Sequence, residues 1–255
     1  MYKILFLMIS ILICQTDKFE EGVAYYNGRA EGANGLVPNA DNISKAIKVF
    51  ESLQEPYNTS EADLNASIYL IKSYYFMAQY VAKGNDDKLL YFELAKDLSE
   101  RYIYKYPESV EVLYWNLATI SNWAKLLGVR QISQLGAADN YRDKAVDVIV
   151  MDPSYEDGGG YFLLGAVYFT APYIPLMINW PDDNKAVKYF KRAVETGRST
   201  PLQMIYLAKA LIETDKLDEA KVILENLMMI TPSEMNFIED SHYITEAKNI
   251  WDENF

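Results

Sequence analysis

The stretch from Tyr161 to Ala193 reads as a pair of helices whose connection is far longer than such a pair needs. Residues at helical spacing mark both helices: Leu164, Gly165 and Tyr168 on the first, and Ala186, Phe190 and Ala193 on the second. A helix-pair repeat ordinarily turns within a few residues, whereas here an apolar insert from Thr170 to Pro181 separates the helices. Stacked helix pairs form shallow concave faces, and an insertion into one repeat usually projects from one face. This feature constrains the chain to a helical array and favours binding over catalysis.

Prolines mark the ends of helices along the chain. Each follows a stretch whose apolar residues recur every three or four positions: Pro56, Pro107, Pro153, Pro201 and Pro232. The interval from Pro201 to Pro232 has nearly the standard length of a tetratricopeptide repeat and matches its pattern. Its small residues, Ala208 and Ala220, allow two antiparallel helices to approach closely. The same two-helix register extends to the longer intervals.

The expected fold class is all-α, a tetratricopeptide-like helix-pair repeat array of about five pairs with a terminal capping helix. The pairs are expected at 17–35 with 41–54, 60–83 with 86–104, 108–127 with 140–151, the split pair, and a pair that starts at the capping residue Thr200; the capping helix is expected at 241–252. No long alternating β pattern competes with this assignment. Because the chain has only one cysteine, an intramolecular disulfide is impossible, and the fold depends on apolar burial.

The N-terminus predicts export and a lipid anchor. Lys3 precedes an apolar run from Ile4 to Ile13, which is too short for a membrane span of about 20 residues and is typical of a signal peptide. Cys14 follows the run directly, as at a lipoprotein processing site, and Ile11 lies three positions before it. We therefore expect residues 1–13 to be a signal peptide and 14–255 a single helical-repeat domain. Lipidation of Cys14 would hold this domain at a bacterial membrane, on its periplasmic side.

Composition excludes several classes of function. The net charge of −12 disfavours nucleic acid as a partner, because an acidic surface repels phosphates. His242 is the only histidine, and no zinc, nucleophile-elbow or Walker-type spacing occurs. The acids that precede Gly158 to Gly160 favour a flexible turn there over an anion-binding loop. We expect no catalytic residues, no metal and no cofactor.

Aromatic residues supply the candidate binding residues. Most of the 21 tyrosines are expected in the core, but the helix around Trp115 and Trp123 carries aromatic side chains on several of its sides. Such a helix can bury one face and line a cavity with another. The candidate cavity-lining residues are Trp115, Asn116 and Trp123. The candidate partner-contact residues lie in the insert and are Pro172, Tyr173 and Trp180.

Taken together, these features resemble the T-component family of tripartite ATP-independent periplasmic (TRAP) transporters. The resemblance rests on the exported start, the Trp115–Trp123 helix, the turn Asp152–Tyr155, the glycine run, and the stretch from Asp152 to Ala193 with its insert. It implies a lipid-anchored helical-repeat protein that docks a periplasmic solute-binding protein. It also implies possible self-association and a cavity that accepts or passes a small apolar ligand.

Two other functions are compatible with the sequence. A scaffold lipoprotein of outer-membrane or cell-envelope protein assembly would use the same repeats, and it predicts an open groove rather than a closed cavity. A cell-envelope hydrolase would need a pair of carboxylates. The pairs Asp86-Asp87 and Asp182-Asp183 each precede a helix, where acids stabilise the positive end of the helix dipole, so neither indicates catalysis.

Overall fold

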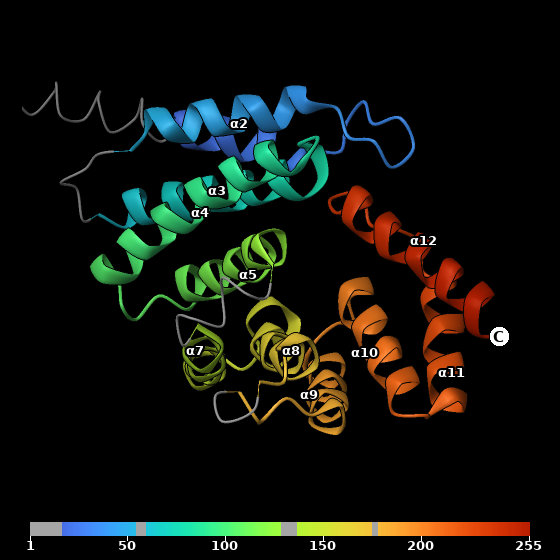
Figure 1. Cartoon of the computed structure of the whole chain (residues 1–255). Coiled ribbons are helices and arrows are strands. Elements are labelled where there is room, and N and C mark those ends of the chain that lie inside the picture. Colours follow the sequence, from blue (N-terminus) through green and yellow to red (C-terminus); the bar gives the residue numbers. More distant parts are fainter. Residues whose placement is uncertain (1–16, 55–59, 129–136, 175–177) are drawn as a thin grey trace, which may run out of the picture. The chain divides into compact units, whose positions relative to one another are not determined.

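The computed structural model describes residues 17–54, 60–128, 137–174 and 178–255 and confirms an all-α fold (Figure 1). Strands are absent from these residues, and the only β-bridges among them are the isolated pairs Asn34–Val37 and Ile174–Ile178. No described helix is long and apolar enough to cross a membrane. The predicted signal peptide and Cys14 lie outside the described residues. The chain divides into two compact units, Met1–Pro107 and Glu108–Phe255, which are described separately below.

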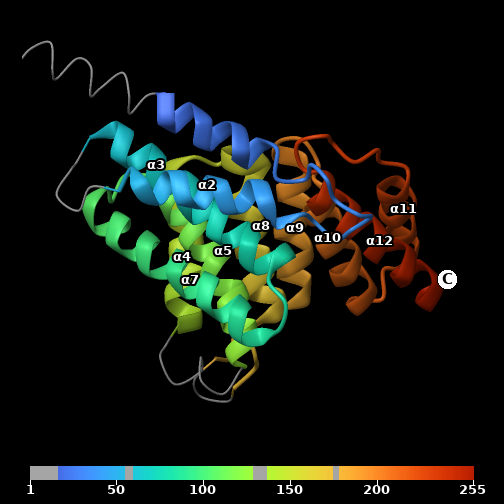
Figure 2. The same ribbon diagram turned by 90° about the horizontal axis from the view of Figure 1, so that it is seen from above.

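Unit 1 contains the first two predicted pairs. Its elements are a helix at residues 17–27, α2 (Ala40–Ser52), α3 (Glu61–Phe76), a π-helical turn η1 (Met77–Val81) and α4 (Asn85–Lys105). Asn39 and Ser60 cap α2 and α3, because each side chain accepts a hydrogen bond from a backbone N–H of the first turn. Helix α3 packs against both α2 and α4, and the two views show these helices side by side (Figure 2). Phe50, Phe76 and Phe92 fill the space between them.

Unit 2 contains the remaining pairs and the predicted capping helix. Its helices are α5 (Val110–Leu127), α7 (Ala137–Met151), α8 (Tyr155–Thr170), α9 (Asp183–Thr196), α10 (Pro201–Glu213), α11 (Leu217–Met228) and α12 (Phe237–Asn254). Each packs against the next, and α8 also contacts both α5 and α10, so the first helices of successive pairs are neighbours. Helix α12 covers the apolar faces of α10 and α11 through Ile244, Ala247 and Ile250. The predicted capping helix therefore lies where the sequence places it.

Small residues set the close approach of the helix pairs, as the sequence predicts. Gly165 of α8 lies under the ring of Phe190 of α9, so that a Cβ at this position would be 2.8 Å from the ring. Ala208 of α10 and Ala220 of α11 are both fully buried. The start of α10 has the predicted capping box, in which Thr200 and Gln203 each bond the other's backbone N–H. Local signals and packing thus agree in this part of the chain.

Candidate functional site

The insert between α8 and α9 is a hairpin-like loop whose ends are fixed. Ile174 and Ile178 pair through two backbone hydrogen bonds of 2.8 Å, and residues 175–177 between them lie outside the described part of the chain. Ile178 is buried, and Asp182 caps α9 by accepting a hydrogen bond from the N–H of Lys185. The backbone N–H of Asp182 also bonds the carbonyl of Tyr168 in α8, at 3.1 Å. The insert therefore leaves and rejoins the helix pair at defined positions.

Trp180 attaches the insert to α7. Its indole N–H donates to the Asp139 carboxylate at 2.9 Å, and the Arg142 guanidinium lies 4.8 Å from the ring centre. Asp139 and Arg142 also form an ion pair at 3.1 Å. On its other side the indole packs edge-on against Tyr168, which stacks on Tyr189. Trp180 thus holds the insert on α7 and α8, a contact that the chain spacing alone did not indicate.

Tyr173 is an exposed aromatic side chain of the insert. It is 67% exposed, whereas Pro172 beside it is half-buried. Trp180 fixes the loop on α7 and α8. The predicted partner-contact residues therefore differ in position: Tyr173 is exposed, Pro172 is half-buried and Trp180 anchors the loop. A preorganised loop loses little conformational entropy on binding, which favours recognition.

The candidate ligand-lining residues of α5 occupy different environments. Trp115 is half-buried, and its indole N–H donates to the Tyr155 hydroxyl at 3.3 Å. Trp123 lies eight residues further along α5 and is likewise half-buried. Asn116 is fully buried. The two tryptophans are thus both partly exposed, whereas Asn116 belongs to the interior of unit 2.

The glycine run before Tyr161 is a packing device and differs from the flexible turn expected from the sequence. Glu156, Asp157 and Gly158 all have left-handed backbone conformations, and the three glycines are buried. A Cβ at Gly158 would lie 2.8 Å from a carbonyl oxygen of α9, and one at Gly160 would lie 2.8 Å from a side-chain carbon of α7. The local sequence pattern cannot reveal these close contacts of the glycines, because they are made with helices that are distant in sequence.

The left-handed turn is fixed by hydrogen bonds from the loop before α10 and from the first turn of α10. The Asp157 carboxylate accepts from the Arg198 backbone N–H at 3.0 Å, and the Asp157 carbonyl accepts from the Gln203 side chain at 2.8 Å. Just upstream, the Ser154 hydroxyl and N–H both donate to Asp152, which lowers the pKa of that carboxyl. These contacts position the start of α8.

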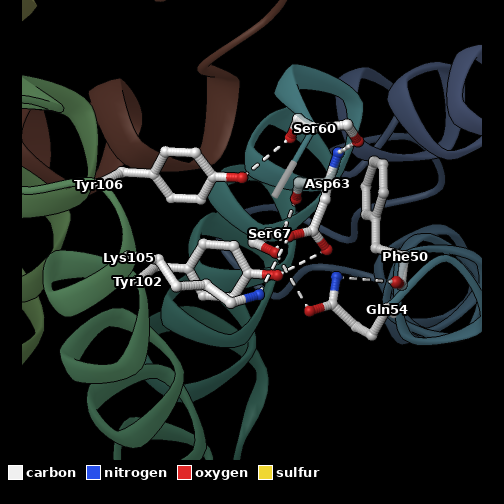
Figure 3. Close-up of polar contacts among 8 residues, drawn as sticks. All are labelled: Phe50, Gln54, Ser60, Asp63, Ser67, Tyr102, Lys105 and Tyr106. Carbon is white, nitrogen blue, oxygen red and sulfur yellow. Dashed lines mark hydrogen bonds and ion pairs between the residues drawn. The ribbon is translucent and has the colours of Figure 1, made fainter. Parts of the chain in front are cut away.

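Unit 1 holds a buried polar cluster around Asp63 (Figure 3). Tyr102 of α4 donates to the Asp63 carboxylate at 2.7 Å, and the Lys105 ammonium lies 3.4 Å from its other oxygen. Ser67 donates to the Asp63 carbonyl and to Gln54, which links α3 to the end of α2. Burial and the neighbouring carboxylate raise the pKa of Tyr102 above its usual range. The polar groups of the cluster bond one another, so the cluster joins α3 to α4 and to the end of α2.

A metal centre finds no support in the described ranges, which contain no group of three or more His, Cys, Asp or Glu side chains arranged to hold an ion. His242 lies edge-on to Tyr243 on α12. Sequence reasoning also missed a contact between α5 and α10, in which Lys125 donates to the Tyr206 hydroxyl at 3.1 Å. The two residues are far apart in the chain, and only the stacking of first helices brings them together.

Comparison with known proteins supports the architecture and assigns no family. No family model matches the sequence. No curated protein matches it either. The structure is similar to that of TTC0263, a thermophilic tetratricopeptide repeat (TPR) protein of Thermus thermophilus, with a TM-score of 0.57 at 14% identity over 94% of this chain and 98% of that chain.

Two structures of MamA also align with the chain at 14% identity. For a mutant of MamA the alignment covers 89% of this chain and 98% of that chain, and for MamA MSR-1 it covers 92% and 99%; both TM-scores are 0.45 and carry no weight for the architecture. The likeness to the Thermus protein shows the fold alone. With the helix pairs described above, it defines the class: an all-α protein built as a TPR-like helix-pair repeat array.

Proposed function

We propose that this protein is a non-catalytic adaptor that binds a protein partner through the insert of residues 170–181. One observation carries the proposal: the insert is fixed by Trp180 on Asp139 and Arg142 while Tyr173 is 67% exposed. Exposed aromatic side chains on rigid supports are typical of residues that dominate binding energy at interfaces. A repeat array supplies the extended surface that such an interface needs.

The partner we propose is the solute-binding protein of a TRAP transporter. Support comes from the resemblance of residues 152–193, with their proline-bearing insert, to the T-component family. In this role the protein would work at the periplasmic face of a bacterial membrane, held there by a lipid on Cys14. The partly exposed Trp115 and Trp123 would meet a small apolar ligand or the partner itself. A scaffold role in outer-membrane assembly uses the same fold and is the alternative outcome of the test.

A capture experiment tests the partner. A tagged soluble form beginning at Gln15 is incubated with periplasmic extract, and bound proteins are identified by mass spectrometry. We expect one solute-binding protein to be recovered, and Tyr173→Ala to weaken its binding by about 30-fold, the cost of removing an interface hot spot of about 2 kcal/mol. Tyr104→Ala is the control, because Tyr104 is 91% exposed on α4 and lies outside the insert. Recovery of outer-membrane proteins instead would overturn the transporter role.

A fractionation experiment tests the anchor. The full-length protein expressed in a bacterium should sediment with membranes and require detergent for release, because two or more acyl chains give stable anchoring. Growth with a labelled fatty acid should label this protein, whereas Cys14→Ser should remain unlabelled with unchanged helical content. Absence of label from the wild-type form would exclude a lipid on Cys14 as the anchor.

A further inference from the structure

The first helices of unit 2 form a cationic cluster around one tyrosine. Lys125 of α5 donates to the Tyr206 hydroxyl of α10 at 3.1 Å, and its ammonium is 5.7 Å from the ring centre. The ammonium of Lys209, one turn along α10, is 5.2 Å from the same ring centre. Both charges thus lie within cation–π distance of a single ring.

The ring of Tyr206 is held in place by aromatic side chains of α8 and α9. Its ring packs edge-on against Phe162 of α8 with 5.2 Å between ring centres, and at a tilt against Phe190 of α9 with 5.8 Å. Phe190 is fully buried and Phe162 nearly so. Since the ring is fixed by the core, the position of its hydroxyl is set before any ligand arrives. Preorganised donors of this kind bind without the cost of ordering a mobile side chain.

The cluster presents hydrogen-bond donors. Because the Tyr206 oxygen accepts from Lys125, its own O–H proton is available to donate in another direction. The Lys125 ammonium has three protons, one of which points at Tyr206. Lys125 is exposed and forms an ion pair with no carboxylate in the described part of the chain, whereas Lys209 pairs with Glu246 of α12. Of the two ammonium groups, only that of Lys209 has a carboxylate partner among the described residues, so Lys125, Lys209 and Glu246 together carry one positive charge, on a chain of net charge −12.

We propose that Lys125, Tyr206 and Lys209 bind an acidic side chain of a partner protein's segment that lies along the first helices of unit 2. A carboxylate oxygen accepts from both an ammonium and a phenol, and charge-assisted hydrogen bonds are stronger than neutral ones. The acidity of the rest of the chain acts over longer distances and is screened beyond about 8 Å at physiological salt. The inference rests on the proposed adaptor function and assigns it a second contact, separate from the insert.

Binding of labelled peptides tests the cluster. Fluorescence anisotropy compares fluorescein-labelled hexaglutamate with hexaglutamine at physiological ionic strength, using the full chain from Gln15. We expect hexaglutamate to bind more tightly, and Lys125→Met to weaken it at least about fivefold through the loss of a charge-assisted hydrogen bond. Tyr206→Phe should also weaken binding although it leaves the net charge unchanged. Lys188→Met is the matched control, since Lys188 is an exposed lysine of α9 outside the cluster.

Two results would overturn the proposal. One is equal weakening by Lys125→Met and Lys188→Met, which would show a diffuse charge effect; the other is equal affinity for hexaglutamate and hexaglutamine. Thermal unfolding followed by circular dichroism verifies that each variant is folded. The role of the insert is tested separately. If the wild-type protein captures no partner but still binds hexaglutamate, the proposed adaptor function is wrong while the proposed binding site at Lys125, Tyr206 and Lys209 is supported. Tyr173→Ala is expected to leave peptide affinity unchanged.

Discussion

At the scale of single residues, the hydrogen bond from Tyr102 to Asp63 is a sharp test of unit 1. Tyr102→Phe removes the donor and leaves a buried carboxylate with one partner fewer, so we expect the free energy of unfolding to fall by about 1–3 kcal/mol. Urea unfolding followed by circular dichroism measures the loss. Tyr104→Phe on the same helix is the control and should change nothing, because its side chain is 91% exposed. Equal stability of the two variants would contradict the structural role of the cluster.

The raised pKa values of two tyrosines predict that the folded protein loses stability at alkaline pH. Burial, and then the adjoining carboxylates of Glu51 and Asp63, raise the pKa values of Tyr74 and Tyr102 above the usual value of about 10. The unfolded chain therefore releases these protons at a lower pH than the folded chain does. Their contribution to stability is complete below about pH 10 and is lost as the pH rises further.

Urea midpoints at pH 8 and pH 11 measure this loss of stability in alkali. Tyr102→Phe should lose less stability between the two pH values than wild type does, because one of the two titrating groups is gone. Tyr104→Phe should lose as much as wild type. A Tyr102→Phe variant with the full wild-type loss would show that this hydroxyl does not resist ionisation.

Residue-level prediction from the sequence succeeded where the signal was local. The capping pair Thr200 and Gln203 and the small residues Ala208 and Ala220 have the expected roles. Asp63 gave no such signal, because a carboxylate in the first turn of a helix ordinarily indicates an exposed group that interacts with the helix dipole. Its burial depends on Tyr102 and Lys105, which lie on the next helix. Partners so distant in sequence are invisible to local patterns.

At the scale of elements, the anchoring of the insert by Trp180 leads to a prediction about local opening. Trp180→Ala removes the bond to Asp139 and the packing on Tyr168, so we expect the paired amides of Ile174 and Ile178 to exchange at least about tenfold faster, which corresponds to about 1.4 kcal/mol of local opening. Hydrogen exchange with peptide-level mass spectrometry measures the rates. Tyr173→Ala should leave them unchanged because Tyr173 projects outward. Equal acceleration by both variants would refute the anchoring role.

The contact between α8 and α9 predicts a specific coupling. Gly165→Ala places a Cβ 2.8 Å from the Phe190 ring, and we expect it to cost about 1–3 kcal/mol of unfolding free energy. Phe190→Leu creates space at the same point. The double variant should therefore be more stable than the sum of the single losses implies, and a double-mutant cycle by urea unfolding measures the difference. Strict additivity would contradict the close approach.

Helices were predictable from their periodicity, while their ends and irregularities were not. The stretch expected to be helical over 60–83 is α3 followed by a π-helical turn, and the helix expected from Tyr161 is preceded by a left-handed turn at 156–158. Hydrophobic spacing tolerates both deviations, because neither moves a buried residue off its face. The position of the insert was predictable from its length. Its attachment to α7 could be recognised only from the three-dimensional structure.

At the scale of the whole molecule, the two units differ in content: unit 1 contains mainly stabilising contacts, and unit 2 contains the candidate contact surfaces. The helices of unit 1 are held together by the Asp63 cluster and a core of phenylalanines. Unit 2 contains the insert, the partly exposed Trp115 and Trp123, and the cluster of Lys125, Tyr206 and Lys209. The array was predicted as a single domain, and its division into two compact units adds detail that repeat spacing did not carry. Every candidate contact surface except the proposed anchor at Cys14 belongs to unit 2.

The final prediction is that residues 108–255 fold without the rest of the chain. Their helices pack each on the next and are closed at one end by α12, and repeat arrays derive stability from such nearest-neighbour contacts. All four tryptophans lie in this unit, so tryptophan fluorescence reports on it alone. We expect the isolated unit to unfold in urea in one cooperative step, with Gly165→Ala lowering the midpoint. A gradual transition, with strong binding of an apolar dye before unfolding, would show that unit 2 lacks a complete core of its own.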